Sequence, residues 1–144
     1  MADFFERLLD GNVPHVKIVL AFVILALAVY QLVLIAVVYG RARPPFLDAG
    51  PAAKAHRASG DTIAFLILFV AAACITYYGL EGEEDGATLH VVAAIAVLAI
   101  LVVKVLVVRV GGTLGRLLPL LGLSLFVALA LTVGSAAAIY WGEN

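Results

Sequence analysis

The three histidines of the chain each stand at the start of a long apolar segment. A chain that crosses a membrane repeatedly alternates its direction, so His15 and His90, which open the first and third segments, enter from the same side. They are therefore expected at similar depth on two helices that run in parallel. Two imidazoles in this arrangement can approach a flat ligand from both faces, as axial ligands of a haem iron do. The sequence predicts an outer haem site held by His15 and His90, with interfacial histidines as the alternative.

His90 and Lys104 stand in a His-x13-Lys spacing on the third segment. In a helix this spacing gives a rise of about 21 Å and a rotation of only about 40° from the starting face. The two side chains then project from one face near opposite membrane surfaces, and His56 opens the second segment at the same inner level as Lys104. We expect a second haem or redox site near His56 and Lys104, with the amine as a candidate iron ligand. The alternatives are a lysine that snorkels to the inner surface and one that pairs with a haem propionate.

The composition places these residues in a membrane protein. Of 144 residues, 65% are apolar and 13% are charged, and the mean hydropathy is +1.14. Apolar segments at about 15–39, 59–80, 88–108 and 117–141 each reach the ~20 residues that a helix needs to cross a bilayer. Open strands are excluded in lipid because their backbone groups would lack partners. The chain is predicted to be an all-α, four-helix transmembrane bundle, a single domain over residues 1–144.

The distribution of basic residues predicts the orientation. Six of them fall in or beside the first and third connections: Arg41, Arg43, Lys54, Arg57, Arg109 and Arg116. The opposite side holds only Arg7 and Lys17. By the positive-inside rule both termini of this multi-pass protein are expected to lie outside.

The first connection is rich in proline and glycine. This composition predicts a loop of about fifteen residues, longer than the usual link between bundle helices. Ser59 or Asp61 would then supply the N-cap of the second span. The single cysteine, Cys74, lies within that span and is interpreted as a small packing residue.

Two quoted stretches resemble a known group of proteins. "AHRASGDTIAFLILFVAAACITYYGL" (55–80) and "LHVVAAIAVLAILVVKVLVVR" (89–109) look like the His-Arg-x-x-Gly span and the following His-bearing span of b-type membrane cytochromes, the cytochrome b561 and ferric-reductase-like group. The chain looks closer still to a family of uncharacterised four-helix bacterial membrane proteins, which share a His-x13-Lys third span and the "LLPLLGL" motif. The resemblance covers roughly residues 15–141.

The resemblance implies non-covalent haem b, one or two per chain, and electron transfer across the membrane. His56 and His90 match the ligand-bearing spans of the group, whereas His15 matches only by its place at a helix start. Lys104 stands where a dihaem member would have a second histidine. Three histidines cannot supply four histidine ligands, which puts the two-haem count in doubt. No CxxCH motif for covalent haem occurs.

The resemblance implies an electron-transfer protein, and we expect a subunit rather than a stand-alone enzyme, since a chain this small has no domain of its own to bind a nicotinamide or flavin cofactor. No hydrolytic or phosphate-binding motif is present. Lys17, Arg57 and Arg109 are candidates for pairing with haem propionates. The expected partners are the lipid bilayer, other membrane or extracytoplasmic redox subunits of a respiratory complex, and a quinone. Nucleic acid is not expected, because the basic residues flank the spans. The alternative is a cofactor-free structural or assembly subunit of a membrane complex.

Overall fold

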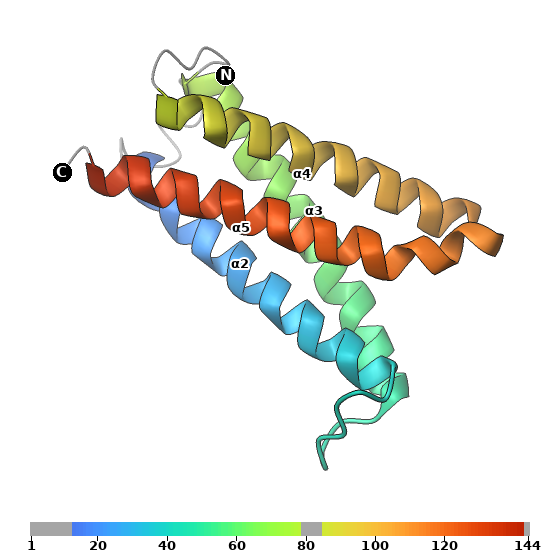
Figure 1. Cartoon of the computed structure of the whole chain (residues 1–144). Coiled ribbons are helices and arrows are strands. Elements are labelled where there is room, and N and C mark those ends of the chain that lie inside the picture. Colours follow the sequence, from blue (N-terminus) through green and yellow to red (C-terminus); the bar gives the residue numbers. More distant parts are fainter. Residues whose placement is uncertain (1–12, 79–84, 143–144) are drawn as a thin grey trace.

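The computed structural model describes residues 13–78 and 85–142 (Figure 1). Within these ranges the secondary structure is entirely helical, which confirms the all-α prediction. The long helices are α2 (Val13–Val38), α3 (Ala49–Tyr78), α4 (Asp85–Val110) and α5 (Leu118–Gly142), and a short 3-10 helix, η1 (Gly112–Leu117), precedes α5.

Four helical stretches are long and apolar enough to cross a membrane: His15–Val38, Ala49–Thr76, Thr88–Val110 and Gly112–Gly142. Only 11 to 22% of the most apolar part of each stretch is buried inside the protein. Most of the apolar side chains therefore face outward, where hydrocarbon covers them without cost. This surface identifies a multi-pass membrane protein.

The second span begins earlier than the sequence indicated. The predicted start at residue 59 and the predicted N-cap at Ser59 or Asp61 are wrong, because α3 begins at Ala49. The carbonyl of Asp48 accepts the first helical hydrogen bond, from the amide of Ala52 at 3.0 Å. Pro51 lies in the first turn, where a missing N–H has no consequence for the helix. The loop after α2 is accordingly confined to residues 39–48.

Glycines end two of the long helices. Gly40, after α2, has a φ of 68°, and the amide of Arg41 reaches back to the carbonyl of Ala36 at 2.8 Å. Gly111 and Gly112, after α4, both have a φ of 66°. This left-handed conformation costs glycine little and reverses the chain at the helix end.

The helices form two antiparallel pairs, α2 with α3 and α4 with α5. The pairs are joined mainly through α2 and α5, and α3 and α4 contact each other much less. Figure 1 shows that the two pairs lie together where α2 begins and α5 ends, here called the terminal end. They diverge toward the opposite end, here called the loop end, which the charge pattern predicts to be cytoplasmic.

The buried side chains follow this arrangement. A central core draws on all four helices, with Ile24, Ile67, Val97 and Leu129 among its members. A small cluster near the terminal end joins α2 to α5. Near the loop end a third cluster, built around Leu34, packs only α2 against α3 and the loop between them. Packing among all four helices is therefore concentrated in the middle of the molecule.

Candidate functional site

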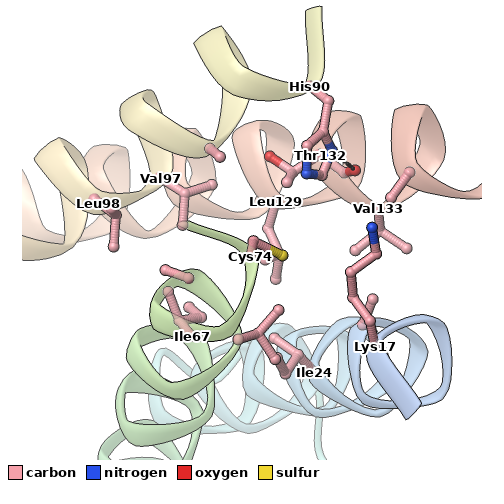
Figure 2. A pocket seen from close by; sticks show the side chains of 15 residues that line it. Lys17, Ile24, Ile67, Cys74, His90, Val97, Leu98, Leu129, Thr132 and Val133 are labelled. Carbon is pink, nitrogen blue, oxygen red and sulfur yellow. Dashed lines mark hydrogen bonds between the residues drawn. The ribbon is translucent and has the colours of Figure 1, made fainter. Parts of the chain in front are cut away.

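A cavity of about 80 Å³ lies among the four long helices (Figure 2). Most of its lining is apolar. Each helix adds one side chain with a heteroatom: Lys17 from α2, Cys74 from α3, His90 from α4 and Thr132 from α5. An apolar hollow with a few convergent polar groups is the usual form of a ligand site.

His90 is held by two groups of α5. Its Nδ1 lies 3.1 Å from the carbonyl oxygen of Thr132 and 3.2 Å from the hydroxyl oxygen of Ser135. A carbonyl oxygen only accepts hydrogen bonds, so the contact with Thr132 assigns the proton to Nδ1. Nε2 of the neutral ring then carries the lone pair. This is the state in which histidine ligates a metal, and metal-bound histidines usually donate the other ring N–H to a carbonyl or carboxylate.

Lys17 and Cys74 approach the cavity from the side opposite His90. Figure 2 shows the Lys17 amine reaching toward Val133 and the Cys74 sulfur directed into the space between the helices. The Lys17 charge acts electrostatically on both Cys74 and His90. The cavity thus combines a cation, an imidazole and a thiol with hydrocarbon walls. It suits an apolar ligand that carries an anionic edge.

His15 is not among the residues that line this cavity. Its side chain is exposed, and its Nε2 lies 2.8 Å from the hydroxyl of Tyr140, with the two rings edge to face. Ser135 is a partner of His90, and Tyr140 lies more than one helical turn beyond it. The separation of Ser135 and Tyr140 along the axis of α5 is roughly 7.5 Å. The two imidazoles therefore contact different stretches of α5. Their pairing across a haem stays a prediction.

A second polar group, here called the Gln31 cluster, consists of Gln31, His56 and Ser59 and joins α2 to α3 near the loop end. The Nε2 of Gln31 donates to the backbone carbonyl of His56 at 2.8 Å and to the hydroxyl of Ser59 at 2.9 Å. Ser59 in turn donates to the carbonyl of Ala55 at 2.6 Å. A Cβ at Gly60 would lie 3.4 Å from Gln31 Nε2. A side chain as small as alanine at this position would therefore make an ordinary van der Waals contact with the amide.

Lys104 lies on α4. The side chain is half-buried, and its charge acts electrostatically on His56 across the space between α3 and α4. Two atoms of the Gln31 cluster, Gln31 Oε1 and His56 Nδ1, are buried without a hydrogen-bond partner among the described residues. The structure thus brings His56 and Lys104 within electrostatic range of each other at the loop end.

The remaining predicted residues lie at the surface. Arg57 and Arg109 are exposed toward the loop end, as basic flanks of their spans. Their pairing with haem propionates stays a prediction. Over residues 13–78 and 85–142, no group of three or more His, Cys, Asp or Glu side chains could hold a bare metal ion.

Sequence reasoning misses two features of the cavity. It treats Cys74 as a packing residue, and it does not foresee the contact of His90 with α5. Thr132 and Ser135 are spaced to share a face of α5. Two hydroxyls at this spacing in an apolar span are a signal that could have indicated a polar partner. No comparable signal exists for Cys74.

The chain belongs to a family of unknown function, DUF6529, whose model matches residues 7–143. No curated protein and no solved structure matches the chain.

Proposed function

We propose that this protein is a membrane-embedded b-type cytochrome that transfers electrons between a partner at the outer face and a quinone or inner partner. The observation that carries the proposal is the state of His90. The ring lines the cavity, and its Nδ1 is committed to the Thr132 carbonyl, which leaves Nε2 with a lone pair for iron. Haem b, when bound, would supply one-electron redox chemistry at that position.

The side chains that line the cavity have the chemistry that a haem site requires. The present volume of the cavity, however, does not accommodate a haem. Lys17 offers a cation for a propionate, and the rest of the lining is largely apolar, as a porphyrin requires. Cofactor pockets usually enclose roughly 300 Å³ or more, so about 80 Å³ is too small for a haem as it stands. Enlargement would occur most easily between α3 and α4, the neighbouring helices with few contacts.

The second axial ligand is assigned to His15, as the sequence predicts. In that role the ring has to exchange the Tyr140 hydroxyl for iron, because the same Nε2 atom makes the contact with Tyr140. A further haem near His56 and Lys104 would give the protein its second redox centre. Lys17, Arg57 and Arg109 would pair with propionates.

The protein would act as a subunit of a larger respiratory complex rather than alone. The four helices account for nearly all of the described residues, which leaves them no separate domain for a nicotinamide or flavin cofactor. Electrons would therefore come from, and pass to, other redox subunits or a quinone in the membrane. A bacterial or archaeal plasma membrane is the proposed location.

The proposal is tested by the haem content of purified protein after haem-replete expression, quantified as pyridine haemochrome. Wild-type protein is expected to hold one or two haems b per chain, and His90→Ala to lose at least one. Leu89→Ala, at the neighbouring and exposed position, is the matched control and should keep the full content. Equal haem in wild type and His90→Ala would overturn the assignment of His90.

The second candidate is a cofactor-free structural or assembly subunit. The small cavity and the engagement of His15 by Tyr140 both favour it. A colourless wild-type protein that co-purifies with other membrane subunits would support this alternative.

A further inference from the structure

We propose that two copies of this chain associate in the membrane through the outward face of α3, where the Asp61 side chains of the two copies hydrogen-bond to each other. This face of α3 lies opposite the side chains that pack against the other helices. The association is therefore independent of whether the bundle holds a haem.

Asp61 lies deep in the membrane-spanning part of α3. The helix begins at Ala49, so Asp61 is inside the span rather than at its start. Ile63, two residues further along α3, belongs to the central core that draws on all four helices. Since a helix rises about 1.5 Å per residue, Asp61 is only about 3 Å from this level of the core along the axis of α3.

The contact between α2 and α3 places Asp61 at a similar depth. Ser59 accepts a hydrogen bond from Gln31, which lies about two helical turns before the end of α2 at Val38. Asp61 is one further step inward and is therefore roughly 13 Å inside the loop-end terminus of α2. An aspartate side chain is too short to reach the head groups from this depth, as a lysine or an arginine can.

The Asp61 side chain faces away from the bundle. It is exposed, whereas Ile63 on the other side of the helix is buried. Over residues 13–78 and 85–142 it has no hydrogen-bond or ion-pair partner. Arg57 is one turn earlier, but helical side chains lean toward the helix N-terminus, so a cation four residues before an acid is poorly placed to pair with it. Ionisable groups inside a membrane are almost always paired, so Asp61 requires a partner from outside the chain.

Asp61 is part of a continuous exposed stripe on α3, here called the α3 stripe. Its members follow one another at alternating intervals of three and four residues, which is the spacing at which two helices pack along their length with a shallow crossing angle. Phe65 and Leu68 are 67% and 56% exposed. The alanines of the stripe allow two backbones to approach closely. The α3 stripe consists of Ala58, Asp61, Phe65, Leu68, Ala72 and Ile75.

A second copy of the chain supplies the complementary group for Asp61. Two copies in one membrane share an orientation, so a two-fold axis between them runs along the membrane normal and brings identical residues to the same depth. The two Asp61 side chains then meet. A protonated carboxyl both donates and accepts, so each can donate to its counterpart and no charge remains in the hydrocarbon. A phospholipid head group is a poorer partner, because it stays at the membrane surface.

The association is tested by energy transfer between copies of the full chain in liposomes. In a Cys74→Ala background, Phe46→Cys offers an exposed position for a donor or an acceptor dye. Separately labelled copies are mixed, and transfer is measured as added lipid dilutes the protein. Asp61→Leu should weaken association about three- to twentyfold, because the hydrogen bond between the helices is lost. Asp61→Asn should retain most of it, since an amide also donates and accepts.

A matched pair of variants tests the rest of the face. Leu68→Ala shortens a side chain of the α3 stripe that is 56% exposed and should weaken association. Ile95→Ala shortens a side chain of α4 that is 58% exposed and should leave association unchanged. Circular dichroism shows whether each variant keeps its helices. Absence of transfer in the parent protein, or equal transfer in Asp61→Leu, would overturn the proposal.

Disulfide cross-linking in membranes locates the interface independently. In the Cys74→Ala background, Phe65→Cys should give a covalent dimer on oxidation. Ala99→Cys, on the exposed face of α4 at the level of the central core, should not. A dimer from Ala99→Cys alone would place the interface on α4 and contradict the proposal.

Haem content is measured on the same preparations. Energy transfer in a colourless protein would sustain the association even if the cytochrome proposal failed. A haem-loaded protein without energy transfer would refute the association alone.

Discussion

The proton on His90 is the residue-scale feature on which the account depends. In an apolar span a histidine without a fixed partner could adopt either tautomer, and its ring could turn to the interface. The Thr132 carbonyl removes that freedom, since it accepts only from a protonated Nδ1. Sequence reasoning could place His90 at the start of a span because the apolar run begins there. It could not find Thr132, because this partner is a backbone atom on another helix, far along the chain.

Tyr140 provides a test of His15 at the same scale. Tyr140→Phe removes the hydroxyl that now lies 2.8 Å from His15 Nε2 and keeps the aromatic ring. If His15 becomes an iron ligand, the variant should bind haem several-fold more tightly, because no competing hydrogen bond has to be broken. Haem titration of the haem-free protein, monitored at the Soret band, measures the change. An unchanged affinity, together with full haem content in His15→Ala, would assign His15 to the membrane interface.

At the scale of elements, hydrophobicity predicts where a helix begins only if the helix begins with its apolar, membrane-crossing part. The sequence predicts the spans beginning at residues 15 and 88 closely, since apolar runs define them. It misplaces the start of α3 because residues 49–58 combine alanine with polar side chains and lie beyond the apolar run. Their helix is stabilised by packing instead. Ala52 is fully buried against α2 in the cluster around Leu34, a tertiary contact that no local pattern reveals.

Substitution at Ala52 tests this packing. Ala52→Leu adds three carbons at a position with 0% exposure, and overpacking of this kind should lower the free energy of unfolding by about 1–3 kcal/mol. Ala49→Leu makes the same change at an exposed position of the same helix turn and should change stability by less than about 0.5 kcal/mol. Denaturant titration in detergent, followed by circular dichroism, compares the two. Equal stability of both variants would show that residues 49–58 do not pack against α2 as described.

At the scale of the whole molecule, two helix pairs share a central core and separate toward the loop end. The sequence predicts the number of spans and the shared side of the termini, because hydropathy and an even span count determine both. It does not predict the pairing of helices or the weak contact between α3 and α4, since uniformly apolar spans carry little information about their neighbours. The cavity and the Gln31 cluster are products of that pairing. Their residues come from distant parts of the chain.

The orientation of the molecule in the membrane is tested at this scale. Phe46 lies in the loop between α2 and α3 and is 85% exposed. In a Cys74→Ala background, Phe46→Cys should resist a membrane-impermeant thiol reagent on intact cells and react after permeabilisation, because the basic residues place this loop inside. Labelling is read by a mass shift on gels. Reaction on intact cells at the same rate as after permeabilisation would reverse the predicted topology.

The central claim is that a haem iron is bound by imidazole within this bundle, and one measurement tests it most directly. It is the reduced-minus-oxidised absorbance spectrum of the purified wild-type protein, recorded beside His90→Ala and Leu89→Ala. The account predicts the bands of a low-spin b-type haem in wild type and Leu89→Ala, and their loss or marked reduction in His90→Ala. A featureless wild-type spectrum after haem-replete expression would contradict it.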